Sequence, residues 1–268
     1  MLAFPAFSVV LLYEKETVNL FLIFAAMSIF SKLFHFSAVS VFPSRCPYCD
    51  KVIDDSDYAC KICPRNFPGF CYSRYTAGGF LCAAPFPYSG VYAKAVKALK
   101  FHNRGDYARP LAAQLVRAVS EIHGDVRFDY VTCVPMHRKD KRNRGYNQAE
   151  LLARECAALM RLTYLDTLEK FKRNHPQHKT GGRDREKNVY GVYRLIDEDI
   201  IKDKNVLIID DIITTGNTLG ECARILSNGK CAEIRCAVVC SADRNKFIAP
   251  GQGSDSACRK GPAQAQKQ

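Results

Sequence analysis

The sequence predicts an α/β protein with an open parallel sheet and flanking helices, and three observations support this. Residues 206–209, VLII, form a short apolar run rich in branched side chains, which is typical of a strand buried in a parallel sheet. A second apolar run, 128–134, ends at Pro135 and is also followed by a helical pattern. After the first run, apolar residues recur on one face of a predicted helix: Leu219, Cys222, Ala223, Ile225 and Leu226.

The remaining elements follow in chain order. Residues 88–100 predict a turn into a helix, and apolar residues at helical spacing predict a second helix over 107–122. Asn147 is the expected N-cap of a third helix that ends near residue 162. Residues 234–240 predict a further strand after the last helix. This order completes the predicted α/β fold.

Length and composition bound the class of protein. The chain has 268 residues, enough for one α/β domain with appendages. Its formal net charge of +12 permits binding of polyphosphate, nucleic acid or an acidic membrane surface, but selects none of them. The 13 cysteines are odd in number and follow no convincing signal peptide, so we expect a cytoplasmic protein with one metal site. The sequence has no GxxxxGK(S/T) motif, which argues against a P-loop NTPase.

The two ends of the chain differ from its middle. Residues 1–45 are expected to form an N-terminal extension, whose apolar stretch 19–30 is too short for a transmembrane span. One alternative is that Met27 is the true start, which leaves a short amphipathic lead-in. Another is that this segment touches a membrane or a partner. Residues 246–268 are low in apolar content and predict a disordered tail.

Two CxxC pairs follow the extension. Cys46 and Cys49 form the first pair, and Cys60 and Cys63 form the second. Four thiolates at this spacing are typical of a tetrahedral Zn²⁺ site without an open position, which predicts a structural metal. The alternatives are a redox-active CxxC and two disulfides. Two further cysteines are candidates to replace one of the four ligands: Cys71 and Cys82.

The end of the 206–209 strand carries the residues with the clearest chemistry. Asp210 and Asp211 follow the strand, and a small polar loop precedes the helix. Backbone N–H groups and hydroxyls at a helix N-terminus bind a phosphate monoester, and Gly216 allows close backbone approach. The carboxylates can accept hydrogen bonds from vicinal hydroxyls or help to hold Mg²⁺. The motif therefore predicts a ribose 5-phosphate site, with a chance acidic pair on a Rossmann-like strand as the alternative. The expected phosphate loop consists of Thr214, Thr215, Gly216, Asn217 and Thr218.

Basic residues gather after the second strand, in the loop MHRKDKRNRGYNQ at 136–148. Ligands of open α/β sheets bind at the carboxyl ends of strands, and clustered Arg and Lys side chains there would meet a pyrophosphate. A solvated basic loop is the alternative. The expected pyrophosphate side consists of His137, Arg138, Arg142, Arg144 and Gly145.

A polar run without periodicity, KRNHPQHKTGGRDREKN, lies at 172–188. Such a loop inside a compact domain is usually a functional lid or disordered.

The motifs and their order resemble a known family. VLIIDDIITTGNT at 206–218 resembles the thirteen-residue phosphoribosyl-pyrophosphate (PRPP) signature of type I phosphoribosyltransferases at every position. The series of paired CxxC, LKF, RGYNQ at 144–148, the polar run and this signature resembles the ComF/GntX family of competence-associated, amidophosphoribosyltransferase-like proteins. The resemblance covers residues 46–240. The chain departs from many relatives because residues 71–82 lack a further clear CxxC. It also has no cysteine directly after the initiator Met, so an N-terminal glutaminase is not expected.

The resemblance implies an organisation and a function. It implies a zinc-ribbon-like region over 46–87 and a phosphoribosyltransferase domain over 88–245. The domain is expected to bind PRPP with Mg²⁺ and to transfer the phosphoribosyl group to an unknown acceptor with release of pyrophosphate. Asp210 and Asp211 are the expected catalytic residues. The polar run lies where such enzymes close a lid, whose expected residues are Gln177, Lys179 and Arg183.

Two other functions stay open. In the first, the fold senses PRPP or a nucleotide without catalysis, or serves as an adaptor in DNA uptake. The resemblance implies a competence helicase and single-stranded DNA as partners for that role, although few aromatic residues interleave with the basic ones. In the second, the chain is a zinc-ribbon nucleic-acid binder with a degenerate phosphoribosyltransferase domain attached. The intact acidic pair argues against such degeneracy. A homodimer is also left open.

Overall fold

The fold is given by a computed structural model that describes residues 43–172 and 191–242. The extension up to residue 42, the tail from residue 243 and the expected lid residues Gln177, Lys179 and Arg183 lie outside the described residues. The chain divides into two compact units. The described part of the first is 43–45 and 52–56, where Arg45 and Val52 form an antiparallel bridge. The second unit contains Cys46–Lys51 and the chain from Asp57 onward.

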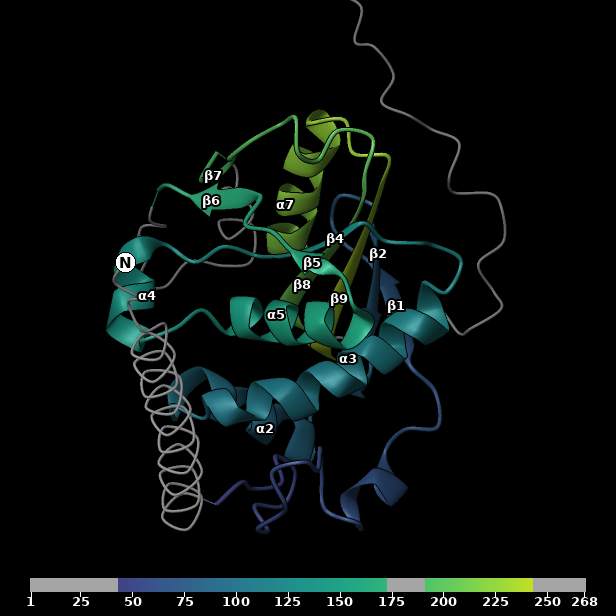
Figure 1. The fold of residues 1–268 in the computed structure, drawn as a ribbon, viewed down its shortest axis with the longest axis vertical. Coiled ribbons are helices and arrows are strands. Elements are labelled where there is room, and N and C mark those ends of the chain that lie inside the picture. Colours follow the sequence, from purple (N-terminus) through teal and green to yellow (C-terminus); the bar gives the residue numbers. More distant parts are fainter. Residues whose placement is uncertain (1–42, 173–190, 243–268) are drawn as a thin grey trace, which may run out of the picture. The chain divides into compact units, whose positions relative to one another are not determined.

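The second unit is built on a seven-stranded sheet (Figure 1). Its order is β1-β2-β9-β8-β4-β5, with β3 paired to the far end of β9. Every pairing is parallel except that of β1 with β2. This confirms the predicted α/β class and adds an antiparallel edge. The strands are β1 (Tyr72–Tyr75), β2 (Leu81–Ala84), β3 (Phe86–Pro87), β4 (Tyr130–Cys133), β5 (Thr163–Tyr164), β8 (Asn205–Ile213) and β9 (Glu233–Ser241).

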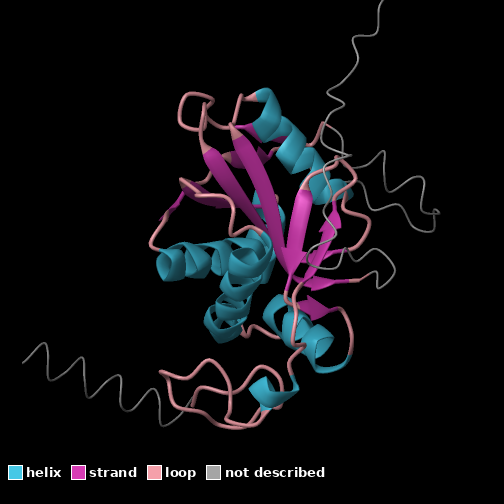
Figure 2. Ribbon diagram, turned by 90° about the vertical axis from the view of Figure 1, so that its right-hand side faces the viewer, coloured by secondary structure: helices cyan, strands magenta, loops and turns pink. Residues whose placement is uncertain are grey.

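Helices cover both sides of the sheet (Figure 2). The expected helices at 88–100, 107–122 and 147–162 are present within a few residues of their predicted bounds. Helices α3 and α5 pack against each other and against the strands (Figure 1). Within the described residues, no helix combines the length and apolar character needed to cross a bilayer. The helices are α2 (Gly90–Phe101), α3 (Ala108–Ile122), α4 (Arg138–Arg144), α5 (Gln148–Met160) and α7 (Asn217–Asn228).

The predicted cap of α5 is confirmed. The Asn147 side chain accepts a hydrogen bond from Ala149 N at 3.2 Å, which satisfies a free amide of the first turn. Its Nδ2 also donates to Val134 O at 3.0 Å, at the end of the β4 segment. This one side chain therefore fixes the start of α5 against the carboxyl end of the neighbouring strand.

The sequence predicts a loop for the basic segment after β4, but this segment forms the two-turn helix α4. His137 is the N-cap of this helix. The His137 ring nitrogen Nδ1 accepts a hydrogen bond from Lys139 N at 3.2 Å. Gly145 ends the helix with a positive φ of 89°, a conformation that favours glycine. The basic side chains are therefore arranged on helical turns.

Strand β8 is the centre of the sheet. It lies between β4 and β9, and the run 206–209 is fully buried, as the sequence predicted. The strand does not stop at Ile209. It continues through Asp210 and Asp211 to Ile213, which pairs with Ser241 of β9. The acidic pair therefore lies within the strand.

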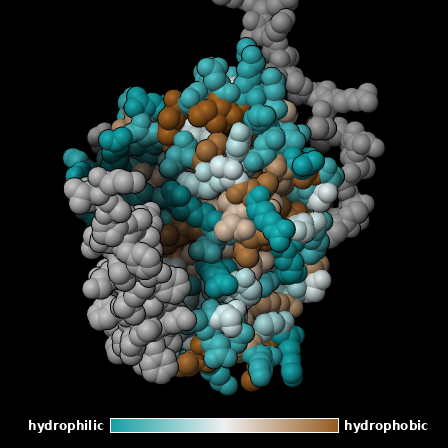
Figure 3. Space-filling view, in the orientation of Figure 1, coloured by the Kyte–Doolittle hydropathy of each residue, from teal (hydrophilic) through white to brown (hydrophobic). Residues whose placement is uncertain are grey.

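Three of the strands fall in the range expected for a zinc ribbon. Strands β1, β2 and β3 belong to residues 46–87 and join the main sheet through β9. The four cysteines precede these strands, and the division of the chain at residue 88 stays a prediction. A separate two-stranded antiparallel sheet, β6 (Leu168–Lys170) with β7 (Tyr193–Leu195), flanks the segment that is not described. On the face shown in Figure 3, hydrophilic residues predominate and hydrophobic ones gather in small groups.

Candidate functional site

The PRPP-like signature folds as a strand, a tight loop and a helix. Strand β8 ends at Ile213, and Gly216 is the N-cap of α7. Thr215 Oγ1 lies 3.4 Å from Asn217 N, which donates to it. The loop encloses a small cavity of about 50 Å³, lined by Asp210 and residues 212–219. Amide groups at the start of a helix attract anions, so this cavity is suited to a phosphate group.

Gly216 is required by the protein's own backbone. Its φ is 82°, and a Cβ there would lie 3.0 Å from both Thr76 Cα and Ala77 N. Ala77 N donates to Gly216 O at 3.4 Å. One turn later, a Cβ on Gly220 would lie 2.8 Å from Gly78 N. The turn between β1 and β2 therefore packs directly against the signature loop. This contact was not predicted from the sequence.

The two carboxylates point to opposite sides of β8. Side chains alternate along a strand, so neighbouring residues face different ways. Asp210 lines the phosphate-loop cavity, and its Oδ1 accepts a hydrogen bond from Asp211 N at 2.8 Å. Burial, and then the charge of Asp211, raise the pKa of Asp210 well above the usual carboxyl range. The sequence predicts one common role for both residues, whereas the strand directs their side chains to different sides.

Asp211 meets a residue that the sequence analysis did not single out as a site residue. Its Oδ2 lies 3.1 Å from Lys100 Nζ, at the end of α2. This oxygen is buried and has no hydrogen-bond partner of good geometry among the described residues. The lysine side chain is 31% exposed and the aspartate side chain 9%. Electrostatic attraction thus holds the two side chains together, and the Lys100 side chain stays partly exposed to solvent.

Lys100 also lines a second, larger cavity near the phosphate-loop cavity's strand. The cavity has a volume of about 400 Å³ and lies between the end of α2 and helix α4, and we call it the α2–α4 cavity. It connects Asp211, through Lys100, to the basic helix. The residues that line it are Lys100, Phe101, Asn103, Asp140, Asn143, Arg144 and Tyr146.

Of the predicted basic residues, Arg144 is the one that lines this cavity. Its Nη1 donates to Gln148 Oε1 at 2.8 Å, and its guanidinium lies 5.6 Å from the Phe101 ring centroid. Arg138 instead pairs with Glu169 at 3.2 Å. Arg142 is exposed and forms no ion pair with a described residue. Of the residues predicted to bind pyrophosphate, Arg144 therefore lines the cavity, whereas Arg142 is exposed to solvent.

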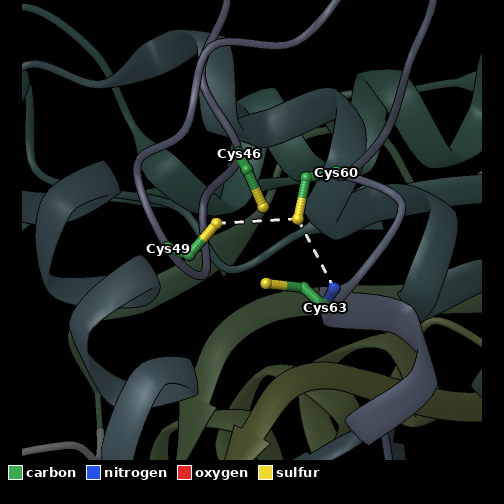
Figure 4. A group of neighbouring side chains, drawn as sticks. All are labelled: Cys46, Cys49, Cys60 and Cys63. Carbon is green, nitrogen blue, oxygen red and sulfur yellow. Dashed lines mark hydrogen bonds between the residues drawn. The ribbon is translucent and has the colours of Figure 1, made fainter.

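The four predicted metal ligands come together (Figure 4). The sulfur atoms of Cys46, Cys49, Cys60 and Cys63 lie within 4.8 Å of one another and point toward a common centre. Sulfurs around a tetrahedral Zn²⁺ at about 2.3 Å are roughly 3.8 Å apart, so a small contraction would fit the ion. The amides of Cys63 and Ile62 lower the pKa of Cys60 to about 6, which favours a thiolate. The donor set suits zinc.

Cys71 and Cys82 are not part of this group in the described residues. Burial raises the pKa of Cys71 to about 12, and its backbone N donates to Glu121 Oε1 at 2.7 Å. Cys82 is fully buried in β2 opposite Cys236 of β9. Both residues are therefore parts of the packed sheet and its edge.

An aromatic cluster connects the cysteines to the sheet. Tyr48, inside the first CxxC, packs edge-to-face on Phe67 at 4.7 Å and on Phe86 at 5.7 Å between ring centroids. Phe86 is fully buried in β3, and it stacks on Tyr92 of α2 at 4.2 Å. The four-cysteine region thus shares a core with the sheet that carries the signature.

Comparison with known proteins agrees with this architecture. Residues 143–261 match the family model of the phosphoribosyl transferase domain. The chain is 28% identical over 149 residues to DNA utilization protein YhgH of Salmonella typhi, which covers 54% of this chain and 65% of that protein. Competence protein F of Haemophilus influenzae is 29% identical over 136 residues, covering 49% and 59%. Competence protein ComFC of Bacillus subtilis is 27% identical over 157 residues, covering 56% and 59%.

The aligned part spans less than two thirds of the length of each of these relatives. The family-model match begins at the end of α4 and includes the signature together with β8 and α7. Together with the signature at residues 206–218, these matches support the resemblance of the chain to ComF-type proteins with a type I phosphoribosyltransferase domain.

Proposed function

We propose that this protein binds PRPP with Mg²⁺ and transfers the phosphoribosyl group to an acceptor with release of pyrophosphate. The observation that carries the proposal is the junction of β8 and α7. There, Asp210 lines the same cavity as the loop at 214–218, while Asp211 pairs with Lys100 on the other side of the strand. A phosphate site beside carboxylates that can hold vicinal hydroxyls matches the two ends of a ribose 5-phosphate.

In the proposed reaction, the bond between ribose C1 and the pyrophosphate oxygen breaks, and its electron pair leaves with pyrophosphate. A lone pair of the acceptor forms the new bond to C1, and the acceptor releases a proton to solvent. The ribosyl carbon passes through an oxocarbenium-like state. Negative charge at Asp211 would stabilise this cationic centre, the carboxyl oxygens of Asp210 would accept hydrogen bonds from the ribose hydroxyls, and the loop at 214–218 would hold the 5-phosphate.

Positive charge is needed where pyrophosphate leaves. Arg142 and Arg144 on α4 and Lys100 on α2 are the candidates in the described residues. The carboxylates that fit a magnesium ion, directly or through the ribose hydroxyls, are Asp210 and Asp211. Mg²⁺ would supply further neutralisation of the leaving group.

We also propose that the four-cysteine group holds a structural Zn²⁺. The set offers four sulfur ligands and no oxygen or nitrogen ligand, which is typical of a closed site. Its contact with the core through Tyr48 gives the metal a role in stabilising the unit.

Calorimetric titration with three ligands tests the main proposal. PRPP, pyrophosphate and ribose 5-phosphate are titrated in the presence of Mg²⁺ into wild type, Arg142→Ala and Asp211→Asn. Arg142→Ala should lose affinity for pyrophosphate and PRPP and largely keep it for ribose 5-phosphate. Asp211→Asn should bind pyrophosphate almost normally and lose turnover, because a neutral amide stabilises a cationic centre less well. Absence of PRPP binding by the wild type would refute the proposal.

An adaptor role in DNA handling is the second candidate. It is favoured by the net charge of +12 and by relatives named as DNA utilization and competence proteins. In that role, single-stranded DNA and a helicase would be the partners, and PRPP would be a regulatory ligand. Arg142→Ala would then weaken DNA binding with a shallower salt slope and leave PRPP affinity unchanged. Titration at two salt concentrations separates the two functions.

A further inference from the structure

We infer that Gln148 is a positioning residue, which fixes the guanidinium of Arg144 where the pyrophosphate of the proposed reaction would bind. This inference rests on the proposed function, because that function assigns Arg144 to the leaving pyrophosphate. Gln148 is not among the site residues predicted from the sequence. Three features support its role: a hydrogen bond to Arg144, a buried place at the start of α5, and an amide donor without a partner.

Arg144 needs an external support. It is the last residue of α4 and is partly exposed, and the chain turns at once through Gly145, whose φ is 89°. A long side chain at such a helix end has many rotamers to choose from. The guanidinium lies 5.6 Å from the ring centroid of Phe101, but that residue is 65% exposed, and an exposed cation–π contact is weak. The ring alone therefore does not fix the guanidinium.

Gln148 supplies the hydrogen bond that does. Arg144 Nη1 donates to Gln148 Oε1 at 2.8 Å. The two residues belong to different helices, since α4 ends at Arg144 and α5 begins at Gln148 after the Asn147 cap. The hydroxyl of Tyr146, between them, donates to Leu99 O at 2.5 Å and ties the connection to α2. The turn between α4 and α5 therefore brings the two side chains together.

The acceptor is itself held rigidly. Gln148 is 2% exposed and lies in the first turn of α5, which packs against β4 and β8. The preceding residue, Asn147, is 6% exposed and donates from Nδ2 to Val134 O at 3.0 Å. A guanidinium that is bound to a fixed acceptor is already ordered before a ligand arrives. Binding then costs less side-chain entropy.

The remaining half of the amide indicates that Gln148 does not serve stability. A guanidinium only donates, so Oε1 must face Arg144 and Nε2 must face away from it. Nε2 is buried and has no hydrogen-bond partner among the described residues. A buried donor without a partner lowers the stability of the fold. A methionine of similar length would fill the same place without this loss, so the bond to Arg144 is what the amide contributes.

Calorimetry on Gln148→Met tests the inference. Pyrophosphate and ribose 5-phosphate are each titrated with Mg²⁺ into the whole protein. Pyrophosphate affinity should fall about threefold to tenfold, the usual cost of ordering one long side chain on binding. Ribose 5-phosphate affinity should be unchanged. The urea midpoint should not fall, because Arg144 is partly exposed and water can replace its lost bond. Unchanged pyrophosphate affinity, or an equal loss for both ligands, would overturn the inference.

Side-chain NMR tests the positioning without any ligand. The ¹⁵N order parameter of the Arg144 Nε–H group reports how firmly the guanidinium is held, and the loss of its signal in Arg144→Lys assigns it. The order parameter should fall in Gln148→Met. If it stays at the wild-type value, Gln148 does not fix Arg144 and the inference is wrong. This measurement is valid whether or not the protein binds PRPP.

Gln114→Met is the matched control. On α3, Arg117 Nε donates to Gln114 Oε1 at 3.2 Å, so the same kind of bond is removed outside the candidate site. Pyrophosphate affinity and the Arg144 order parameter should both be unchanged in this variant. A change in either as large as that in Gln148→Met would show that the effect is not specific to Gln148.

A double-mutant cycle then shows whether Gln148 acts through Arg144. In an Arg144→Ala background, Gln148→Met should cause no further loss of pyrophosphate affinity. The same threefold to tenfold loss in both backgrounds would mean that Gln148 acts independently of Arg144, which contradicts the inference. Wild-type protein that binds neither pyrophosphate nor PRPP would instead contradict the proposed function.

Discussion

Lys100 and Asp211 form an ion pair in which the Nζ and Oδ2 atoms lie 3.1 Å apart, connecting the last turn of α2 to the signature strand. The aspartate side chain is almost completely buried, and the lysine side chain is about one third exposed. A buried carboxylate that loses its partner is left uncompensated, so the pair should be strongly coupled. Nothing in the pattern of either segment alone indicates that they meet.

The first prediction concerns this pair. A double-mutant cycle with Lys100→Met and Asp211→Asn, followed by urea unfolding, should give a coupling energy of about 1–2 kcal/mol. The control is the pair Lys141–Glu150, which is 2.6 Å long but has a lysine side chain that is 47% exposed. Solvent screens that pair, so its coupling energy should stay below about 1 kcal/mol. Equal coupling in both cycles would mean that burial does not strengthen the Lys100 pair.

The second prediction concerns the phosphate loop. Gly216→Ala should lower the free energy of unfolding as well as PRPP affinity, because the residue has a positive φ and Thr76 and Ala77 leave no room for a Cβ. We expect a loss of about 2–3 kcal/mol, since strain and backbone displacement add. Thr215→Ala should reduce PRPP affinity with little change in stability.

Gly145→Ala is the control for the backbone strain. Gly145 also has a positive φ, of 89°, but a Cβ there would have no atom within 4 Å. It should lose only the strain, about 1–2 kcal/mol. The difference between the two glycines, measured by urea unfolding, reports the contact between the signature loop and the β1–β2 turn. No difference would show that this turn does not support the loop.

The third prediction concerns metal. Protein purified under reducing conditions should contain one Zn²⁺ per chain by elemental analysis, and Cys60→Ser should lose it. A chelator should also lower the thermal midpoint, because the aromatic cluster around Tyr48 depends on the fold of the first CxxC. Cys71→Ser is the control, since Cys71 lies outside the four-sulfur group and should keep full zinc occupancy. Zinc-free wild-type protein that is fully stable would contradict the assignment.

Features that depend on residues close together in the chain were predicted from the sequence. They are the buried run 206–209, the apolar face of α7 and the cap at Asn147. Helix α4 was not predicted as a helix. Its sequence, RKDKRNR, contains no apolar residue, so it has no hydrophobic period to detect.

The orientation of the acidic pair was accessible but was missed. Ile212 and Ile213 are strand-forming residues after the aspartates, and they indicate that the strand continues through Asp210 and Asp211. Alternation along a strand then separates the two carboxylates. In contrast, the contacts of Lys100 with Asp211 and of Thr76 with Gly216 join distant segments. Such contacts depend on tertiary packing, which no local pattern encodes.

The last prediction concerns acid stability and His123. This imidazole is 1% exposed at the end of α3, and its Nε2 lies 2.9 Å from Cys236 O in β9. The carbonyl can only accept, so Nε2 carries the proton, while buried Nδ1 has no partner among the described residues. Burial, supported by the charge of Arg235, lowers the pKa of His123 to about 4, against about 6.5 in an unfolded chain.

The unfolded state therefore binds a proton at a higher pH than the folded state does. Stability from neutral His123 is complete above pH 6.5, falls as the pH drops toward 4, and changes no further below that value. The expected loss is about 3 kcal/mol. His123→Gln keeps a donor for Cys236 O without a titrating ring, so its free energy of unfolding should fall less steeply between pH 6.5 and 4. His102→Gln, at an exposed histidine, is the control and should follow the wild type. Parallel curves for wild type and His123→Gln in urea unfolding would show that His123 does not cause the acid sensitivity.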